Sequence, residues 1–448
     1  MLDINDLREA KGGNPELARE SQRRRFANVP LVDEVIEQDN QWRDAIFRTE
    51  RLRTEFNALN KEIGQRRKAK EDTADLQERS KALKQSIATT EEESARLESK
   101  RDAALATIGN YVHDSVPVSA DEVDNTVVRT WGEARNEDGL KNHVDLVLLL
   151  DLVDLEAGTS VAGGRGFFLR KEGVLLNQAL VQAALAHGLA AGCEPIMTPF
   201  FMRRDVMAEC AQLSQFDEEL YKVSGEGEDK YLIATSEQPL CAMHRKQWFD
   251  ETQLPLKYIG YSTCFRKEAG SHGRDTTGIF RVHQFEKVEQ FFVTSPHGHA
   301  SWEALEEMLT NAEGFYQALG LPYQVVNIVS GELNSAAAKK YDLEAWFPAS
   351  RKFRELVSCS NCTDYQARRL EVRLRAPKAP GAPERKDYVH MLNCTLTATE
   401  RTLCCVLETY QTPEGVRVPP LLQKYMPNCQ DFIPFRKKFN AKGQPVDL

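Results

Sequence analysis

The chain has 448 residues, of which 41% are hydrophobic, so it can form two or three domains with a sizeable core. Its formal net charge of −9 excludes an overall basic field, so any contact with nucleic acid needs a local basic patch. The first residues contain no apolar stretch typical of a signal peptide. The apolar segment 144–158 is interrupted by Asp151 and Asp154 and is too short to cross a bilayer. We therefore expect a soluble cytoplasmic protein without a membrane partner.

The segment from about residue 30 to residue 109 has the pattern of an antiparallel helical hairpin. Residues 32–63 and 76–108 each place apolar side chains at most positions of a heptad-like 4-3 spacing, and the polar stretch 64–75 between them lacks this period. At ~1.5 Å per residue, a helix of about 35 residues is ~50 Å long, too long to be buried in a compact domain. We therefore expect a projecting coiled-coil arm within an N-terminal domain, residues 1–112.

Basic residues are concentrated where the arm turns. Between residues 51 and 70 the chain has seven basic and two acidic residues, and beyond residue 71 the balance becomes acidic. Most charge runs are solvated helix faces, and the arm by itself favours that interpretation. The alternative is a contact with the phosphate backbone of a nucleic acid. Its residues would be Arg66, Arg67, Lys68 and Lys70.

The rest of the chain predicts a second domain of mixed helices and short strands. Residues 113–135, with a proline and several acids, are typical of a linker, residues 136–435 of a folded domain, and residues 436–448 of a flexible polar tail. The strand–helix alternation and the G-x-G-x-x-G and Walker motifs of parallel nucleotide-binding sheets are missing from this sequence. We therefore expect an α+β fold.

Residues 265–291, FRKEAGSHGRDTTGIFRVHQFEKVEQF, predict two strands joined by a glycine-containing loop. Alternation along a strand places polar and aromatic side chains on one face. These are Arg266 and Glu268 on the first strand, and Arg281, His283, Phe285, Lys287 and Glu289 on the second. Aligned charges are costly to bury without partners, so they either pair with each other or bind a ligand. A ligand with a phosphate, an aromatic ring and an ammonium group would use all of them.

The ten cysteines have no disulfide-framework spacing, which indicates a reducing compartment. Cys359-x-x-Cys362 is half of a metal motif, but a second half is missing, so ordinary cysteines near a core are favoured. A disulfide between Cys210 and Cys241 stays open.

Residues 265–291 resemble motif 2 of the class II aminoacyl-tRNA synthetases, and in detail that of the eukaryotic cytosolic seryl-tRNA synthetases. GCEPIMTPFFM (192–202) resembles motif 1, with Pro199 in the strand that forms the dimer. ATSEQPL (234–240) resembles the serine-specificity loop, and residues 354–369 and 393–426 resemble the approach to motif 3 and motif 3 itself. The N-terminal hairpin is similar to the arm with which this family holds tRNA.

The resemblance implies a coiled-coil arm plus a class II catalytic domain built on an antiparallel β-sheet flanked by helices. It implies ATP-dependent attachment of serine to tRNA(Ser), and to tRNA(Sec) where present, through seryl-adenylate. It also implies Mg²⁺, a homodimer, an arm that binds the long variable arm of the tRNA, and no DNA partner.

The resemblance also assigns roles to individual residues. Arg266 and Arg401 would be catalytic. The serine site would be Thr235, Glu237, Arg266, Glu289 and Asn393, and Glu355 and Ser358 would hold Mg²⁺. The ATP site would be Arg266, Lys267, Glu268, Arg281, Val282, Phe285, Glu355, Leu356, Val357, Ser358 and Arg401.

One departure is Thr395, where many bacterial relatives have serine, and the zinc ligands of the methanogen-type enzymes have no clear counterpart. Two alternatives stay open. The chain could activate another amino acid, or it could be a synthetase-like protein without activity, kept for RNA binding. The serine loop with Glu289 and the arm disfavour the first, and an intact set of ATP residues disfavours the second.

Overall fold

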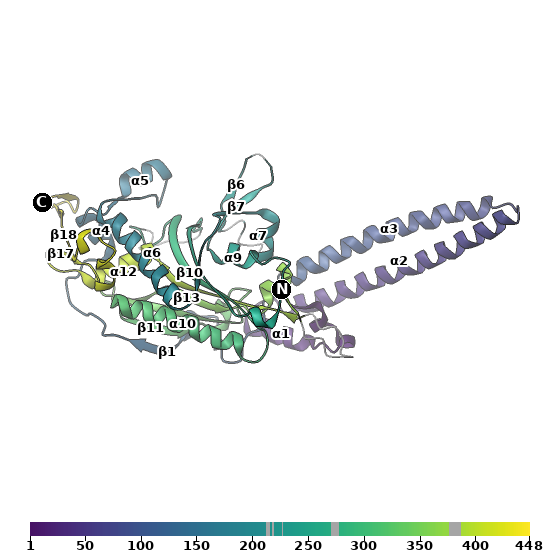
Figure 1. Cartoon of the computed structure of the whole chain (residues 1–448), viewed down its shortest axis with the longest axis horizontal. Helices are drawn as coiled ribbons and strands as arrows, with labels where there is room; N and C mark the ends of the chain where they lie inside the picture. Colours follow the sequence, from purple (N-terminus) through teal and green to yellow (C-terminus); the bar gives the residue numbers. More distant parts are fainter. Residues whose placement is uncertain (212–215, 217–218, 226, 270–276, 376–386) are drawn as a thin grey trace. The chain divides into compact units, whose positions relative to one another are not determined.

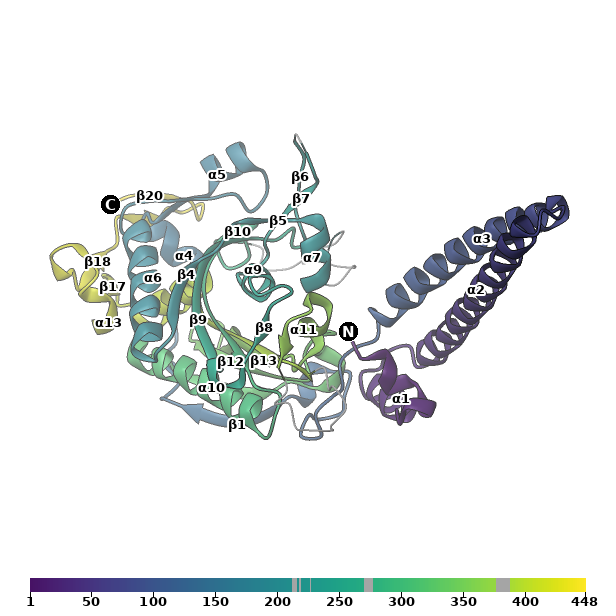
Figure 2. The same ribbon diagram turned by 45° about the vertical axis from the view of Figure 1, so that its right-hand side comes forward.

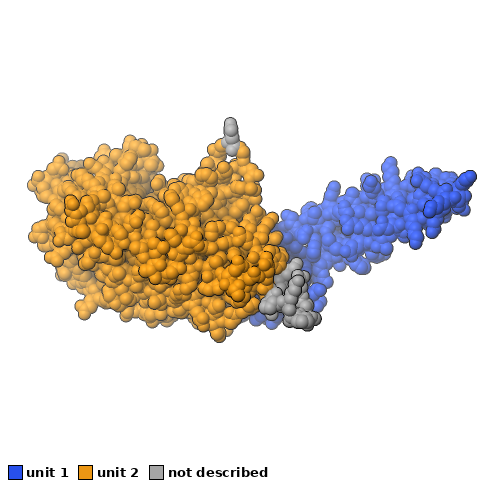
Figure 3. Space-filling model, viewed as in Figure 1, with its two compact units in different colours: residues 1–111 blue, residues 112–448 orange. Residues whose placement is uncertain are grey.

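The computed structural model describes residues 1–211, 216, 219–225, 227–269, 277–375 and 387–448. The chain forms two compact units, residues 1–111 and 112–448, which Figure 3 colours separately.

Unit 1 contains the predicted helical hairpin. A short helix α1 (Pro15–Arg24) precedes two long helices, α2 (Pro30–Lys68) and α3 (Ala74–Leu105), which run antiparallel and side by side (Figures 1 and 2). Ile63 of α2 packs with Leu76 of α3, and both are positions of the predicted 4-3 spacing. Leu59 joins this contact in place of the predicted neighbour Asn60, which is exposed. The coiled-coil arm expected from the sequence is therefore confirmed.

Charged residues at heptad positions of the hairpin pair with one another. Asp39 of α2 is buried and accepts from Arg8 at 2.7 Å and from Arg101 of α3 at 3.2 Å. The Arg101 guanidinium also lies 4.3 Å from the centre of the Trp42 ring. Because each buried charge has a partner, these positions are compatible with a largely apolar helix contact.

Unit 2 is built on an eight-stranded sheet with the order β1-β11-β12-β13-β16-β10-β9-β4. Every neighbouring pair in it is antiparallel except β4 and β9. Its strands are β1 (Thr126–Trp131), β4 (Glu194–Met197), β9 (Leu256–Phe265), β10 (Gln284–Thr294), β11 (Tyr323–Asn327), β12 (Lys339–Phe347), β13 (Lys352–Asn361) and β16 (His390–Ala398).

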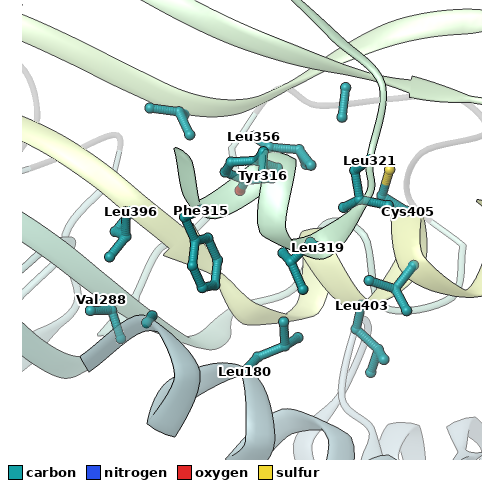
Figure 4. Packing of buried hydrophobic residues seen from close by; sticks show 14 of the residues in the cluster. Leu180, Val288, Phe315, Tyr316, Leu319, Leu321, Leu356, Leu396, Leu403 and Cys405 are labelled. Atoms are coloured by element: carbon teal, nitrogen blue, oxygen red, sulfur yellow. The ribbon is translucent and has the colours of Figure 1, made fainter. Parts of the chain in front are cut away.

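The main core lies between this sheet and three helices, α6 (Glu172–Ala190), α10 (Ala300–Leu319) and α12 (Thr399–Tyr410). Figure 4 shows Leu180 of α6, Phe315 of α10 and Leu403 of α12 packing near strand residues such as Val288. Helix α6 is long and apolar enough to span a membrane by composition, but its apolar side chains contribute to this core.

The remaining elements are shorter. The helices are α4 (His143–Leu149), α5 (Leu155–Ala162), α7 (Arg204–Cys210), α9 (Glu237–Ala242), α11 (Tyr365–Leu370) and α13 (Pro420–Gln423). The strands are β2 (Val153–Asp154), β3 (Phe168–Leu169), β5 (Phe201–Arg203), β6 (Lys222–Val223), β7 (Lys230–Leu232), β8 (Trp248–Phe249), β14 (Arg373–Leu374), β15 (Asp387–Tyr388), β17 (Gly415–Arg417), β18 (Phe432–Pro434), β19 (Lys437–Phe439) and β20 (Pro445–Asp447).

Two segments are more ordered than the sequence predicts. Within the expected linker, β1 pairs with β11 along the edge of the sheet, although all of its side chains are exposed. In the expected flexible tail, β19 pairs with β20, and the preceding Arg436 is bound to Glu172 at 2.6 Å. Backbone pairing and ion pairs, such as those of Arg436 with Glu172 and of Lys437 with Asp151, order these segments. Interactions of this kind produce no apolar periodicity in the sequence.

Candidate active site

A cleft in unit 2 brings together residues from β10, β13, β16 and the start of α12. Of the eleven sequence-predicted ATP residues, nine line it, and these are Arg266, Glu268, Arg281, Val282, Phe285, Glu355, Leu356, Ser358 and Arg401. The other two lie elsewhere: the Val357 side chain is fully buried in the core, and the Lys267 backbone N–H donates to the Glu219 carbonyl at 2.9 Å.

The two strands of the predicted hairpin are shorter than expected. Strand β9 ends at Phe265 and β10 begins at Gln284, so Arg266, Glu268, Arg281 and His283 lie beyond the strand ends. The loop between the strands includes residues 270–276, which lie outside the described residues. The expectation that these four side chains follow strand alternation is therefore wrong.

The ends of this loop are nevertheless held close together. The Arg266 N–H donates to the His283 carbonyl at 2.9 Å, and the Arg281 guanidinium donates to Glu268 at 3.3 Å. Arg266 also donates from Nε to the Ala234 carbonyl at 3.2 Å, and its guanidinium lies 5.3 Å from the centre of the Phe285 ring. Two arginines and an aromatic ring therefore face one cleft, a combination suited to a phosphate and a purine.

Beside the cleft, Glu289 of β10 forms the centre of a cluster of hydrogen-bonded polar groups, here called the Glu289 pocket. Its buried carboxylate accepts from Lys287 Nζ at 2.6 Å, from Ser236 Oγ at 3.0 Å, from the Glu237 N–H at 3.2 Å, and from the Thr235 hydroxyl. Burial opposes ionisation, but the Lys287 ammonium and the hydroxyl donors hold the pKa of Glu289 below its ordinary value. The pocket thus contains an ionised carboxylate with several donors around it.

Glu237 supplies a second carboxyl group to this pocket. It accepts a hydrogen bond from Gln366 at 2.7 Å, while burial and the nearby Glu289 carboxylate raise the pKa of Glu237 to about 7. Asn393 lies on the neighbouring strand β16, where Thr395 is paired with Glu289. Asn393 is two residues from Thr395 and donates to Cys362 Sγ at 3.7 Å. The structure therefore joins Thr235 and Glu237 to Glu289 by hydrogen bonds and places Arg266 on the adjoining Ala234 carbonyl, while Asn393 lies on the adjacent strand.

Glu355 and Ser358 approach the cleft through an irregularity in β13. Three residues apart on a regular strand, they would face opposite sides. The register shifts between them, since Val357 pairs with Leu343 whereas Glu355 pairs with Glu344, and both side chains line the cleft. The Glu355 side chain is 48% exposed, and the Arg401 guanidinium, 3.6 Å away, lowers the pKa of its carboxyl group.

The oxygen atoms of Glu355 and Ser358 are of the kind that Mg²⁺ prefers. An ionised carboxylate and a hydroxyl are hard donors, and Mg²⁺ in nucleotide sites is typically held by one or two carboxylates together with substrate phosphates and water. The described residues contain no group of three or more His, Cys, Asp or Glu side chains placed to bind a metal ion. Cys359 and Cys362 are both buried thiols.

Cys210 and Cys241 are both free thiols. Burial, together with a hydrogen bond to Cys210, raises the pKa of Cys241 well above its ordinary value.

Sequence reasoning gave no role to several residues of the site. Lys287 and Ser236 bind Glu289 directly, and Phe280 and Glu400 line the cleft. Strand alternation had placed Lys287 on the same face as Phe285 and Glu289, but the family resemblance assigned it no individual role. Glu400 accepts the Glu286 N–H at 3.2 Å, a contact between distant segments that no local pattern indicates.

At the turn of the arm, the four predicted tRNA-binding residues gather at the end of α2. Arg66 donates to Glu62 at 2.8 Å, and Arg67, Lys68 and Lys70 are exposed.

The comparisons with known proteins agree with this geometry. The chain matches the family models of the seryl-tRNA synthetase N-terminal domain, over residues 1–112, and of the tRNA synthetase class II core domain (G, H, P, S and T), over residues 221–410. It is 60% identical over 438 residues to a serine–tRNA ligase of Helianthus annuus, covering 98% of this chain and 99% of that protein. The chain belongs to the seryl-tRNA synthetase family.

Solved structures of seryl-tRNA synthetases share the fold. The cytoplasmic enzyme of Naegleria fowleri, in complex with AMP, matches with a TM-score of 0.86 and 53% identity, over 97% of this chain and 99% of that one. The Pyrococcus horikoshii enzyme, complexed with ATP, matches with a TM-score of 0.87 and 42% identity, over 97% and 100%. The expected α+β class II fold and serine–tRNA ligase activity are confirmed.

Proposed function

We propose that the cleft binds ATP and that the adjoining Glu289 pocket binds serine, so that seryl-adenylate forms where the two meet, at Arg266. The observation that carries this is the position of Arg266. It stacks near Phe285 on the cleft side and binds the Ala234 carbonyl beside Thr235 of the serine pocket. A guanidinium there can bridge the α-phosphate and the serine carboxylate.

The first step needs no side-chain base, because the serine carboxylate is already ionised at neutral pH. One carboxylate oxygen attacks the α-phosphorus in line, the bond to the bridging oxygen breaks, and pyrophosphate leaves. Arg266 neutralises charge at the α-phosphate, and Arg401 and Arg281 bind toward the distal phosphates, while Phe285 stacks on adenine and Glu268 contacts the adenine or ribose side. Catalysis then consists of positioning and charge stabilisation.

Glu355 and Ser358 would hold Mg²⁺, which supplies a positive charge to the phosphates when bound. ATP is the co-substrate, a role supported by the related structures solved with AMP and with ATP. In the second step, a terminal ribose hydroxyl of the tRNA attacks the carbonyl carbon of seryl-adenylate, and AMP leaves.

Serine is selected by polarity. Glu289 and Glu237 can accept from the substrate ammonium, Thr235 and Glu289 can bond its hydroxyl, and Asn393 contacts serine from β16. A site built around a hydroxyl rejects alanine strongly, because alanine leaves buried polar groups unpaired. Threonine must be rejected by shape.

The arm would bind the long variable arm of tRNA(Ser), and of tRNA(Sec) where present. Its basic turn suits a phosphate backbone, and such contacts set affinity rather than sequence preference. The relatives named cytoplasmic favour the same compartment for this chain.

The catalytic unit would act as a homodimer. Large apolar side chains are exposed on consecutive elements, namely Val161, Phe168, Val174, Leu189 and Met197. β4 ends the order of the described strands, so one of its edges is open to a second copy. Sedimentation should give about 100 kDa, twice the 50.7 kDa chain, as for a closed two-fold assembly. A fully active monomer would contradict it.

The deciding experiment is ATP–pyrophosphate exchange with a panel of amino acids, followed by charging of tRNA with and without its long variable arm. Exchange that depends on serine alone supports the proposal. Exchange with another amino acid would show that the enzyme activates that amino acid instead. Binding of tRNA without any exchange would indicate a synthetase-like protein that binds RNA but is inactive.

A further inference from the structure

The ring of Phe280 lies where the ATP cleft meets the core. It lines the cleft although it is only 5% exposed, and it follows a turn in which Gly278 has φ of +73°. Phe280 packs edge-on against Phe347, with ring centres 5.6 Å apart, and lies 5.7 Å from the His143 ring. The ring is therefore held on its core side and has little freedom to move.

Two guanidinium groups lie against this ring. Arg401 is 5.1 Å from its centre, and Arg354 is 5.2 Å from it and 5.5 Å from the Phe347 ring. A guanidinium within about 6 Å of an aromatic ring is attracted by its quadrupole, and more strongly where water is excluded.

Arg401 has a second partner, Glu355, whose carboxylate lies 3.6 Å from Arg401 Nη1. In the proposed function Glu355 also binds Mg²⁺. When Glu355 turns to a cation, its hold on Arg401 weakens, whereas the ring of Phe280 stays in place. The ring of Phe280 is thus a constraint on Arg401 that does not depend on Glu355.

We infer that Phe280 is a positioning residue for ATP binding, which holds the Arg401 guanidinium in its place by a cation–π contact. This rests on the proposed function, in which Arg401 binds the distal phosphates. An aliphatic side chain at this position would fill the space but leave Arg401 to swing between Glu355 and solvent.

The test uses the full-length enzyme with Phe280→Leu, Phe280→Met and Phe280→Tyr. The readouts are the Kd of ATP by calorimetry without serine, and kcat and both KM values in pyrophosphate exchange. We expect Leu and Met to raise the Kd and KM of ATP by roughly 2- to 30-fold, with the KM of serine unchanged. Tyr, which keeps the ring face, should restore ATP binding to within about twofold.

Phe315→Leu is the matched control, since it loses a fully buried ring of the same core whose ring contacts are with His187 and Tyr316. We expect it to lower Tm without changing the KM of ATP. If Phe315→Leu raises that KM as much as Phe280→Leu does, Phe280 is only structural and the inference is overturned. If Phe280→Leu does not fold, Phe280→Met and Phe280→Tyr carry the same comparison.

A double-mutant cycle separates this inference from the proposed function. In an Arg401→Leu background, Phe280→Leu should not weaken ATP binding further, because the group that it positions is gone. An equal further loss in that background overturns the inference alone. If Arg401→Leu itself leaves ATP binding unchanged, the proposed role of Arg401 fails, and the inference fails with it.

Discussion

Lys287 donates to Glu289 at 2.6 Å from two positions earlier on the same strand, and the two side chains are 10% and 2% exposed. The alternation of β10 places both on one face, so a local sequence pattern produces a buried ion pair. A buried carboxylate without a partner would take up a proton rather than stay charged. The ammonium of Lys287 therefore keeps Glu289 ionised in the serine pocket.

We expect Lys287→Met to weaken serine binding and the fold together. Breaking a buried pair costs about 3–5 kcal/mol of unfolding free energy. In the intact enzyme the pKa of Glu289 is lowered, so its stabilisation is present above the ordinary pKa and is lost as pH falls through the folded pKa. Without Lys287 the buried Glu289 takes up a proton more readily, so the loss of unfolding free energy in Lys287→Met should be largest at high pH and should shrink as pH falls. Urea unfolding from pH 4 to pH 8 measures it, and identical curves would contradict the prediction.

Arg266→Ala should abolish adenylate formation and leave the fold intact, because within the protein its guanidinium gives up only the Ala234 carbonyl and the contact with the Phe285 ring, whereas its proposed main partner is the ligand. Removing one transition-state charge contact typically costs ~2–4 kcal/mol, a rate loss of up to several hundredfold. Pyrophosphate exchange measures this, with circular dichroism to check the fold. Arg351→Ala, which removes an exposed arginine paired with Asp138, is the control and should keep full activity. Near-normal exchange by Arg266→Ala would refute the proposed site.

Phe285→Ala should act on ATP rather than on serine. The loss of a stacking surface for adenine should raise the KM of ATP by roughly 5- to 100-fold, on the scale of base–aromatic stacking of ~1–3 kcal/mol. The KM of serine should change much less. A comparable rise in both KM values would indicate that Phe285 supports the whole cleft through Arg266 instead.

Serine binding should weaken below about pH 7. Burial and Glu289 raise the pKa of Glu237 to about 7, so Glu237 is increasingly protonated and less able to bind an ammonium group as pH falls. The KM of serine should rise by up to about tenfold per pH unit between pH 6.5 and pH 5.5, and Glu237→Gln should remove that dependence.

The same substitution should change the pH dependence of stability. A raised carboxyl pKa means that the stabilisation by protonated Glu237 is complete below its ordinary pKa and is lost as pH rises through about 7. Glu237→Gln should therefore gain stability relative to the parent between pH 5 and pH 8. Parallel unfolding curves over this range would refute the shifted pKa.

Neutralising the turn of the arm should separate the two reaction steps. Replacing Arg66, Arg67, Lys68 and Lys70 with glutamine should raise the KM of tRNA and flatten its salt dependence, by about 0.7–0.9 in slope for each phosphate that is no longer neutralised. Pyrophosphate exchange should not change. The matched control removes four exposed basic residues of α3 instead, and these are Lys81, Lys84, Arg96 and Lys100.

Deleting residues 30–109 is a stronger form of the same test, with adenylation expected to survive and charging to fail. If both activities fall while the catalytic unit stays folded, the arm is coupled to the active site. If the glutamine variant charges tRNA normally, its basic turn is an ordinary solvated helix face.

Local patterns were enough to predict the helical arm and the chemistry of β10. The apolar spacing of α2 and α3, and the alternation of Phe285, Lys287 and Glu289, depend only on residues a few positions apart. Helix and strand periods convert such spacings directly into faces. The motif resemblance then assigned nine residues that line the cleft.

Tertiary structure decided the features that depend on partners distant in the sequence. The register shift in β13 brings Glu355 and Ser358 to one side, and Phe280 meets Arg401 of α12, more than a hundred residues later. Strand β1 also depends on a distant partner, because it is held by backbone pairing with β11 while its side chains are all exposed. Bulges, strand pairing and ring contacts are set by the packing of whole elements, and a period of two or 3.6 residues carries no information about them.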